Sequence, residues 1–191
     1  MNKNFDIVIV GSGLTGNTCS LALAKAGYNI ALIDPYSFVE ACKNNNDTRT
    51  TALSSKAKVF FEELNIWSLL SSYTCPIRNI LVKDGKSKDN ISFKNGSQNK
   101  ENKPLGYMIE NKILLQQLIK AVIKESKIKK FDSKVLSFYR KKKSVEVKLA
   151  SKKILQCKLI IGADGKNSLI RNLADIGFNK KDYKQKAFIF N

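Results

Sequence analysis

Residues 11–16 read GSGLTG, a spacing of glycines that suits the binding of a pyrophosphate. Gly11 would allow a tight turn, Gly13 would let a phosphate approach the backbone closely, and Gly16 would let a helix pack against a strand. The segment follows an apolar run at residues 5–10 and opens a stretch whose apolar residues have helical spacing. The free N–H groups and positive end of that helix would then face the phosphates.

An acidic residue, Asp34, closes a second apolar run at residues 29–33. Its carboxylate could accept hydrogen bonds from an adenosine ribose, although by itself it could also be a turn residue before Pro35. Strand, helix (residues 14–26) and strand in this order predict a β-α-β unit with parallel strands and a right-handed crossover. The unit predicts dinucleotide binding, and it does not decide between NAD and FAD.

The remaining elements follow from periodicity and from turn residues. We expect a polar loop at residues 42–51 and helices at 52–64, 66–70, 111–124 and 168–174. We expect strands at residues 78–83 and 90–93 in a small antiparallel insertion, a hairpin at 134–139 and 144–149, and strands at 154–161 and 187–190.

Composition removes several classes of chemistry from this chain of 191 residues. It has no histidine, which excludes histidine general bases and histidine-containing zinc sites. Its four cysteines form no Cys-x-x-Cys pair, so neither a zinc site nor a thioredoxin-like motif is indicated, and their spacing is typical of reduced thiols. No apolar run approaches the ~18–20 residues that a membrane-spanning helix needs.

The net charge of +18 has two interpretations. It could be a compositional bias expressed on solvated faces, or it could attract acidic partners such as nucleic acid, membrane headgroups or phosphate-bearing ligands. The lysines are spread along the chain, which favours solvated faces, and the densest run, residues 140–143, falls at a predicted hairpin tip. We therefore expect no nucleic-acid partner, and contact with a membrane surface remains open.

Three further segments, together with the glycine turn, carry a family resemblance. They read DTRTTALS at residues 47–54, LGYMIEN at 105–111 and GADGKNSLIR at 162–171. In this order they resemble the flavin-dependent aromatic hydroxylases, and more narrowly the ring hydroxylases of ubiquinone biosynthesis (the 2-octaprenyl-phenol hydroxylase group). The resemblance covers essentially the whole chain, and its Gly-Ala-Asp-Gly-x-x-Ser-x-x-Arg match is complete.

The resemblance implies roles for individual residues. Those assigned to the pyrophosphate of FAD are Gly11, Gly13, Leu14, Gly16 and Arg49. Those assigned elsewhere are Asp34 at the adenosine ribose, Asn111 at the ribityl region, Val135 near the adenine, and Asp164 with Gly165 behind the pyrophosphate. Each polar residue also has a structural interpretation: Arg49 as a loop cation, Asn111 as a helix N-cap, Asp164 as a turn residue and Arg171 as a surface charge.

The resemblance also implies the architecture. We expect an α/β, Rossmann-like FAD-binding domain with a parallel sheet, a small antiparallel insertion and the start of a truncated substrate domain. The FAD-binding domain would comprise residues 1–70 and 105–179, and the partial substrate domain residues 71–104 and 180–191. Members of the family are about twice as long, so we expect this chain to correspond to their N-terminal half.

The activity implied is that of an FAD-dependent monooxygenase that uses NAD(P)H and O2 to hydroxylate a polyprenylated phenol. Such a protein would be cytoplasmic, at most peripheral at the inner face of a membrane. Three alternatives stay open. The chain could be an incomplete FAD-binding subunit that needs a second chain or associates through its C-terminal strand. It could be a geranylgeranyl-reductase-like flavin oxidoreductase, or a basic module that is not an enzyme.

Overall fold

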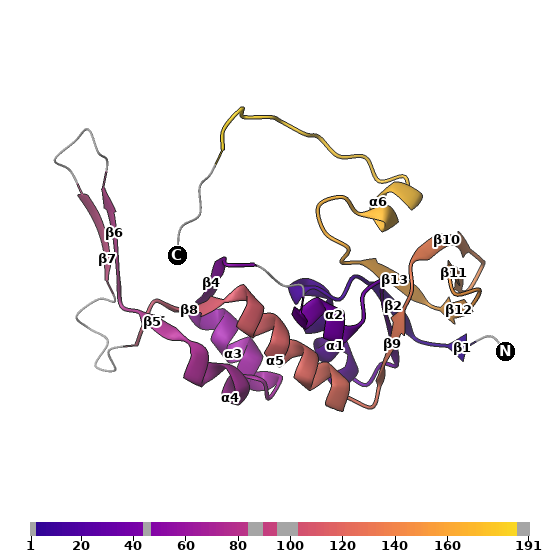
Figure 1. The fold of residues 1–191 in the computed structure, drawn as a ribbon, viewed down its shortest axis with the longest axis horizontal. Helices are drawn as coiled ribbons and strands as arrows, with labels where there is room; N and C mark the ends of the chain where they lie inside the picture. The colour runs from indigo at the N-terminus through magenta and orange to yellow at the C-terminus, as the bar shows by residue number, and fades with distance from the viewer. Residues whose placement is uncertain (1–2, 44–46, 84–89, 95–102, 187–191) are drawn as a thin grey trace. The chain divides into compact units, whose positions relative to one another are not determined.

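The structure is a computed structural model that describes residues 3–43, 47–83, 90–94 and 103–186 (Figure 1). The chain divides into two compact units, one formed by residues 1–46 and 118–191 and the other by residues 47–117. Helix α5 (Asn111–Lys124), predicted in full, begins in the second unit and ends in the first. The predicted strand at residues 187–190 lies outside the described residues.

A four-stranded parallel sheet is the centre of the first unit. Its strands are β13 (Leu159–Gly162), β2 (Ile7–Val10), β3 (Ile30–Asp34) and β9 (Ile128–Asp132), in that order. All pairs are parallel. The two apolar runs of the sequence form β2 and β3, whose residues are almost entirely buried, as expected for strands covered on both faces.

Helix α1 (Leu14–Lys25) connects β2 and β3, so the predicted β-α-β unit is present. Small residues make up much of its buried face, which brings the helix close to the sheet. After α1, Gly27 adopts a φ of +101°, and its N–H donates to the Ala24 carbonyl. A left-handed glycine here ends the helix, as its position after the periodic segment predicts.

A second sheet packs with the first through a shared apolar core. It contains β1 (Lys3–Asn4), β12 (Ile154–Cys157), β11 (Val145–Leu149) and β10 (Val135–Arg140), in that order. β10 and β11 are the predicted hairpin. The core includes side chains from both sheets, among them Val8, Ile33, Phe131, Val147 and Leu155.

The single strand predicted at residues 154–161 is wrong, because the chain there passes from one sheet to the other. β12 ends at Cys157 and pairs with β1 and β11, whereas β13 begins at Leu159 and pairs with β2. The N–H of Lys158, between them, donates to the Asp6 carbonyl at 2.9 Å. Asp6 itself lies between β1 and β2, so two segments change sheets side by side.

Three further elements belong to the first unit. Strand β9 was not predicted, because two adjacent lysines interrupt the apolar pattern of Ile128–Asp132. Helix α2 (Phe38–Lys43) was not predicted either, and its last two residues fall in the expected loop at 42–51. The short helix α6 (Leu169–Leu173) matches the prediction at 168–174, with the Ser168 side chain as its N-cap.

The second unit holds a three-stranded antiparallel sheet and short helices. The sheet order is β4 (Thr50–Ser54), β8 (Gly106–Glu110) and β5 (Cys75–Ile77). The helix predicted at 52–64 begins later, as α3 (Ser55–Glu63), because residues 50–54 extend along β8. Ser54 ends the strand and caps the helix, since its Oγ accepts the Ala57 N–H at 3.1 Å.

Short elements follow α3 in the second unit. They are α4 (Trp67–Leu70), a 3-10 turn (Ser71–Tyr73) and the hairpin of β6 (Asn79–Lys83) with β7 (Asn90–Lys94). The hairpin was predicted, and every described residue of its strands is exposed. Its exposed side chains include Leu81, Ile91 and Phe93.

Candidate dinucleotide-binding site

The glycine turn joins the end of β2 to the start of α1. Gly11 has a φ of +101°, and a Cβ placed on it would lie 2.3 Å from the Ala163 carbonyl oxygen. A Cβ on Gly16 would lie 1.8 Å from the Gly11 carbonyl oxygen, whereas one on Gly13 would have no atom within 4 Å. Gly11 and Gly16 are therefore required for packing within the protein, and Gly13 leaves the backbone open on one side.

The start of α1 is suited to an anion. Gly13 is its N-cap residue, and its first turn carries no acidic side chain. The side chain of Asn17, which is fully buried, donates to the Ser12 carbonyl at 2.5 Å and to the Gly13 carbonyl at 3.0 Å. It therefore holds the turn from within, while the first N–H groups of the helix have no partner inside the helix. No role was predicted for Asn17.

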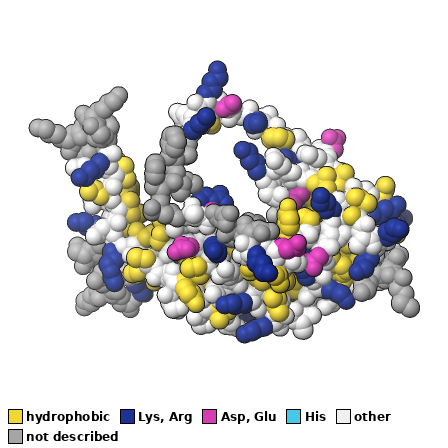
Figure 2. Space-filling view, viewed as in Figure 1, with side chains coloured by type: hydrophobic (Ala, Val, Ile, Leu, Met, Phe, Trp, Pro, Cys, Tyr) yellow, Lys and Arg dark blue, Asp and Glu magenta, His cyan; other side chains and the backbone are white. Residues whose placement is uncertain are grey.

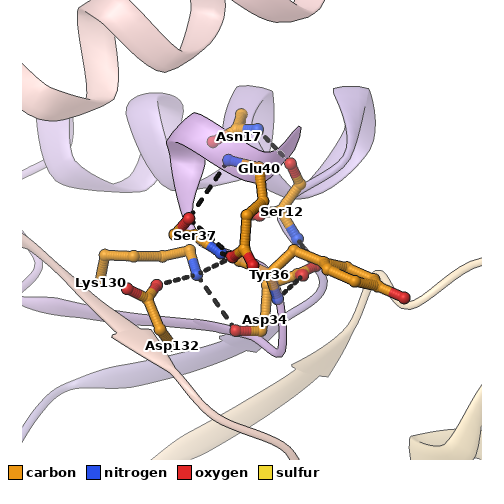
Figure 3. A network of polar contacts seen from close by, with 8 residues as sticks. All are labelled: Ser12, Asn17, Asp34, Tyr36, Ser37, Glu40, Lys130 and Asp132. Carbon is orange, nitrogen blue, oxygen red and sulfur yellow. Dashed lines mark hydrogen bonds and ion pairs between the residues drawn. The ribbon is translucent and has the colours of Figure 1, made fainter. Parts of the chain in front are cut away.

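Asp34 is held at both carboxylate oxygens. Its Oδ2 accepts the Ser12 N–H at 2.8 Å, and its Oδ1 accepts the Tyr36 N–H at 3.0 Å (Figure 3). A carboxylate oxygen has two lone pairs, so each can accept one more hydrogen bond. The residue can thus orient the glycine turn and still accept hydroxyl groups of a ribose.

A cavity of about 570 Å³ lies at the carboxyl ends of β2, β3 and β13, within the first unit. In open α/β sheets this edge, where the strand order reverses, is the usual place for ligands. The structure places six of the predicted residues in its lining: Gly11, Gly13, Asp34, Val135, Asp164 and Gly165. Of the other two in this unit, Leu14 starts α1 half-buried, and Gly16 packs against Gly11.

The carboxylate of Asp164 bonds within its own loop. It accepts the Ser168 hydroxyl at 2.5 Å and the Ile170 N–H at 3.1 Å, so it fixes the start of α6. Gly165, next to it, has a φ of +82°, and a Cβ there would meet nothing within 4 Å. Asp164 thus shapes the loop from behind, and the backbone at Gly165 borders the cavity.

Arg171 supports the same loop from α6. Both terminal nitrogens of its guanidinium donate to the Lys166 carbonyl at 3.2 Å, and its charged group lies 4.2 Å from the centre of the Phe178 ring. These contacts favour a structural role over that of a free surface charge. The complete Gly-Ala-Asp-Gly-x-x-Ser-x-x-Arg match is therefore, in three dimensions, one hydrogen-bonded loop beside the cavity.

Arg49 and Asn111 belong to the second unit, where they meet around Asp47. The Arg49 guanidinium forms two hydrogen bonds with the Asp47 carboxylate, at 2.6 and 2.7 Å. Asn111 donates to Asp47 at 3.1 Å and accepts the Thr51 hydroxyl at 2.5 Å. Two residues that the resemblance assigns to FAD therefore share one cluster, and their contact with the cofactor stays a prediction.

The charges of this cluster stabilise one another. The Arg49 guanidinium beside Asp47, with a further contribution from Asn111, holds the pKa of the Asp47 carboxyl well below its usual range. Asp47 in turn raises the pKa of Arg49. The Arg49 side chain is 61% exposed, so this paired guanidinium still reaches solvent.

Several cavity residues were not predicted from the sequence. They are Pro35, Tyr36, Ser133, Lys134, Leu136 and Asn167. Tyr36 and Leu136 expose apolar side chains at this edge, each about 60% accessible. Proximity in the sequence to Asp34, Val135 or Asp164 was the only available signal for them.

These residues fit a dinucleotide. The open side of Gly13 and the first N–H groups of α1, which have no partner within the helix, suit phosphates. The carboxylate of Asp34 suits a ribose, and the apolar wall near Val135 suits a base. Among the described residues there is no cluster of acidic, cysteine or histidine side chains that could hold a metal ion.

Comparison with known proteins identifies the family. Residues 4–190 match the FAD binding domain family. The chain belongs to this family. The matches to curated proteins include ubiquinone hydroxylase UbiL of Rhodospirillum rubrum, 29% identical over 98% of this chain and 43% of that protein. They also include 3-demethoxyubiquinol 3-hydroxylase of Escherichia coli, 28% identical over 100% of this chain and 49% of that protein.

A solved structure shares the fold. p-Nitrophenol 4-monooxygenase PnpA of Pseudomonas putida superposes with a TM-score of 0.77, at 15% identity, over 94% of this chain and 45% of that one. The predicted FAD cofactor, the α/β fold and the resemblance to ubiquinone ring hydroxylases are confirmed. The chain spans about half the length of the curated relatives it matches.

The distribution of basic side chains and the lengths of the helices relate to the predictions about nucleic acid and membranes. On the face shown in Figure 2, lysine and arginine side chains are dispersed over many elements instead of gathered in one patch. Within the described residues, no helix is both long enough and apolar enough to span a bilayer.

Proposed function

We propose that this chain is the FAD-binding part of a monooxygenase that hydroxylates a polyprenylated phenol in ubiquinone biosynthesis. The observation that carries the proposal is the cavity at the ends of β2, β3 and β13, with the glycine turn and Asp34 on its wall, in a chain of the FAD binding domain family. The names of the curated relatives support the substrate class.

The residues of the first unit would act on the adenosine diphosphate half of FAD. The open backbone at Gly13 and the first N–H groups of α1 would bind the pyrophosphate. Asp34 would accept the ribose hydroxyls, and Val135 would lie against the adenine. Asp164 would keep the Gly165 backbone beside the pyrophosphate by fixing its loop to α6.

The family resemblance assigns Arg49 and Asn111, which belong to the second unit, to the same FAD molecule. The pairing with Asp47 keeps the Arg49 guanidinium in a fixed orientation, and a fork of N–H donors suits a phosphate. Asn111 would contact the ribityl region. Bound FAD would supply the redox chemistry in which NAD(P)H and O2 are consumed, one oxygen atom enters the phenol ring and the other leaves as water. No side-chain nucleophile is needed, in keeping with the lack of histidine.

The test is to titrate the purified chain with FAD while following flavin fluorescence, and then to measure NADH and NADPH oxidation, O2 uptake and hydroxylated product with a prenylated phenol. Binding of FAD followed by substrate-dependent product supports the full proposal. Failure to bind FAD contradicts it.

A second candidate is that the chain binds FAD but does not turn over by itself, because it needs further polypeptide for catalysis. The exposed apolar side chains of β6 and β7 favour it, because an isolated two-stranded hairpin is marginally stable at best in water. The predicted substrate domain at residues 71–104 and 180–191 would then be completed by other residues. FAD binding without NAD(P)H-dependent O2 uptake would support this candidate.

A further inference from the structure

Lys130, on β9, is withdrawn from solvent in a chain whose lysines are mostly exposed. Its side chain is 13% exposed, although the ammonium carries a full charge. The Nζ atom donates to the Tyr36 carbonyl at 2.9 Å, to the Asp34 carbonyl at 3.2 Å and to the Asp132 carboxylate at 2.8 Å (Figure 3). All three N–H bonds of the ammonium therefore have an acceptor, which is the condition for withdrawing such a charge from water.

Two of those acceptors are the backbone carbonyls at either end of the short turn that follows β3. Asp34 and Tyr36 both line the cavity, and the Tyr36 N–H also bonds to the Asp34 carboxylate. The Asp34 carbonyl accepts a second bond, from the Ser133 N–H at 3.0 Å. The turn is thus tied to β9 and to the residue that follows it, more than ninety residues later in the chain.

Through Asp34, Lys130 is also linked to the glycine turn. The Asp34 carboxylate that accepts the Ser12 N–H belongs to the residue whose carbonyl Lys130 holds. Lys130 therefore stabilises Asp34 from outside the cavity. Asp34 itself contacts the glycine turn and lines the cavity. Lys130 is absent from the cavity lining, so it acts through Asp34 and Tyr36.

We propose that Lys130 is a positioning residue for the adenosine half of FAD, an inference that rests on the proposed FAD site. By fixing the carbonyls of Asp34 and Tyr36, it sets the direction in which the Asp34 carboxylate faces the ribose. A simple ion pair with Asp132 does not explain its burial, because Asp132 is 54% exposed and pairs of that kind contribute little. The bonds to the two carbonyls are also charge-assisted, and they hold residues that line the cavity.

The first experiment compares FAD affinity among variants of the full chain by flavin fluorescence. Lys130→Met keeps the length of the side chain and removes its donors, and we expect it to weaken FAD binding by about tenfold. Lys130→Arg, which still offers donors to both carbonyls, should recover most of that loss. Lys129→Met is the matched control, since Lys129 is an exposed neighbour on the same strand, and its affinity should equal that of the wild type.

The second experiment separates positioning from a general loss of structure. Asp34→Asn is combined with Lys130→Met, and FAD affinity is measured for the wild type, both single variants and the double variant. If Lys130 acts through Asp34, Lys130→Met should lower FAD affinity by a clearly smaller factor in the Asp34→Asn background than in the wild type. Independent, multiplicative losses would overturn the positioning role, because a merely structural effect does not depend on Asp34.

The outcomes distinguish the two proposals. A wild-type chain that binds no FAD contradicts the proposed function, and the role of Lys130 falls with it. A wild type that binds FAD, with Lys130→Met binding equally tightly, overturns the role of Lys130 alone. If circular dichroism shows that Lys130→Met does not fold, Lys130→Gln replaces it, and unchanged FAD affinity in that variant would likewise overturn the proposal.

Discussion

The backbone N–H of Ser12 donates a hydrogen bond of 2.8 Å to the carboxylate of Asp34. This contact joins the turn after the first parallel strand to the end of the second, so the acid expected to bind a ribose also orients the loop expected to bind phosphates. One side chain therefore couples two parts of the candidate site. Its removal should affect the folded chain even before any cofactor is added.

Replacement of Asp34 should lower both stability and FAD affinity. In Asp34→Ala the Ser12 N–H loses its acceptor, which should cost about 1–3 kcal/mol of unfolding free energy. FAD affinity should fall by about tenfold or more, because hydrogen bonds to a charged acceptor are lost. Chemical denaturation and flavin titration measure the two effects, and Asp182→Ala, at an exposed position, is the control. Unchanged FAD affinity in Asp34→Ala would remove this residue from the site.

The glycines of the turn should separate folding from binding. Gly16→Ala places a Cβ 1.8 Å from the Gly11 carbonyl oxygen and should destabilise the fold by about 1–3 kcal/mol or more. Gly13→Ala places its Cβ in open space, so the melting temperature should stay near that of the wild type while FAD affinity falls. Melting curves and flavin titrations of the two variants test this. Equal FAD affinity in Gly13→Ala and wild type would show that no ligand approaches that backbone.

The contribution of Asp47 should depend on pH. Its folded-state pKa is lowered by Arg49, so its pairing adds stability above the unfolded value, near the ordinary 3.8, and loses it as the pH falls below that value. Wild type should therefore melt higher than Asp47→Asn at pH 7, and the difference should shrink as the pH is lowered from 4 to 2. Glu110→Gln, an exposed carboxylate on β8, is the control. A difference that is constant across this range would contradict the ion pair.

The cysteines should differ in reactivity. Burial raises the pKa of the Cys157 thiol to about 11, so at pH 8 only about a thousandth of it would be thiolate. Cys75 is exposed. A thiol reagent at pH 8 should label Cys75 first and Cys157 only on unfolding, as mass spectrometry of peptides would show. Rapid labelling of Cys157 in the folded protein would contradict its place in the core.

Much of the first unit could be predicted because local patterns and tertiary packing agree there. The apolar runs that became β2 and β3, the glycine turn and Asp34 need only each other to form a β-α-β unit. Strand β9 was missed because Lys129 and Lys130 interrupt its apolar pattern, and two of the three acceptors of the Lys130 ammonium are carbonyls from a distant turn. Its contribution is not visible in the sequence around it.

The second unit shows the opposite case. Ala52 and Leu53 suit a helix, so the predicted helix began at 52, yet pairing with β8 extends residues 50–54 as a strand. The ion pair of Arg49 with Asp47 likewise depends on a turn whose geometry the residue types do not specify. Long-range pairing decided the first feature and local turn geometry the second, and single-sequence periodicity contains no information on either.

The parallel sheet is assembled across nearly the whole length of the chain, since Ile7–Val10 pairs with Leu159–Gly162. During synthesis the ribosome releases the first of these strands long before the second exists. The nascent β-α-β unit must wait with one edge open, and strand pairing at such separation is slow. Translation speed and chaperone supply during expression should therefore affect the yield of folded protein.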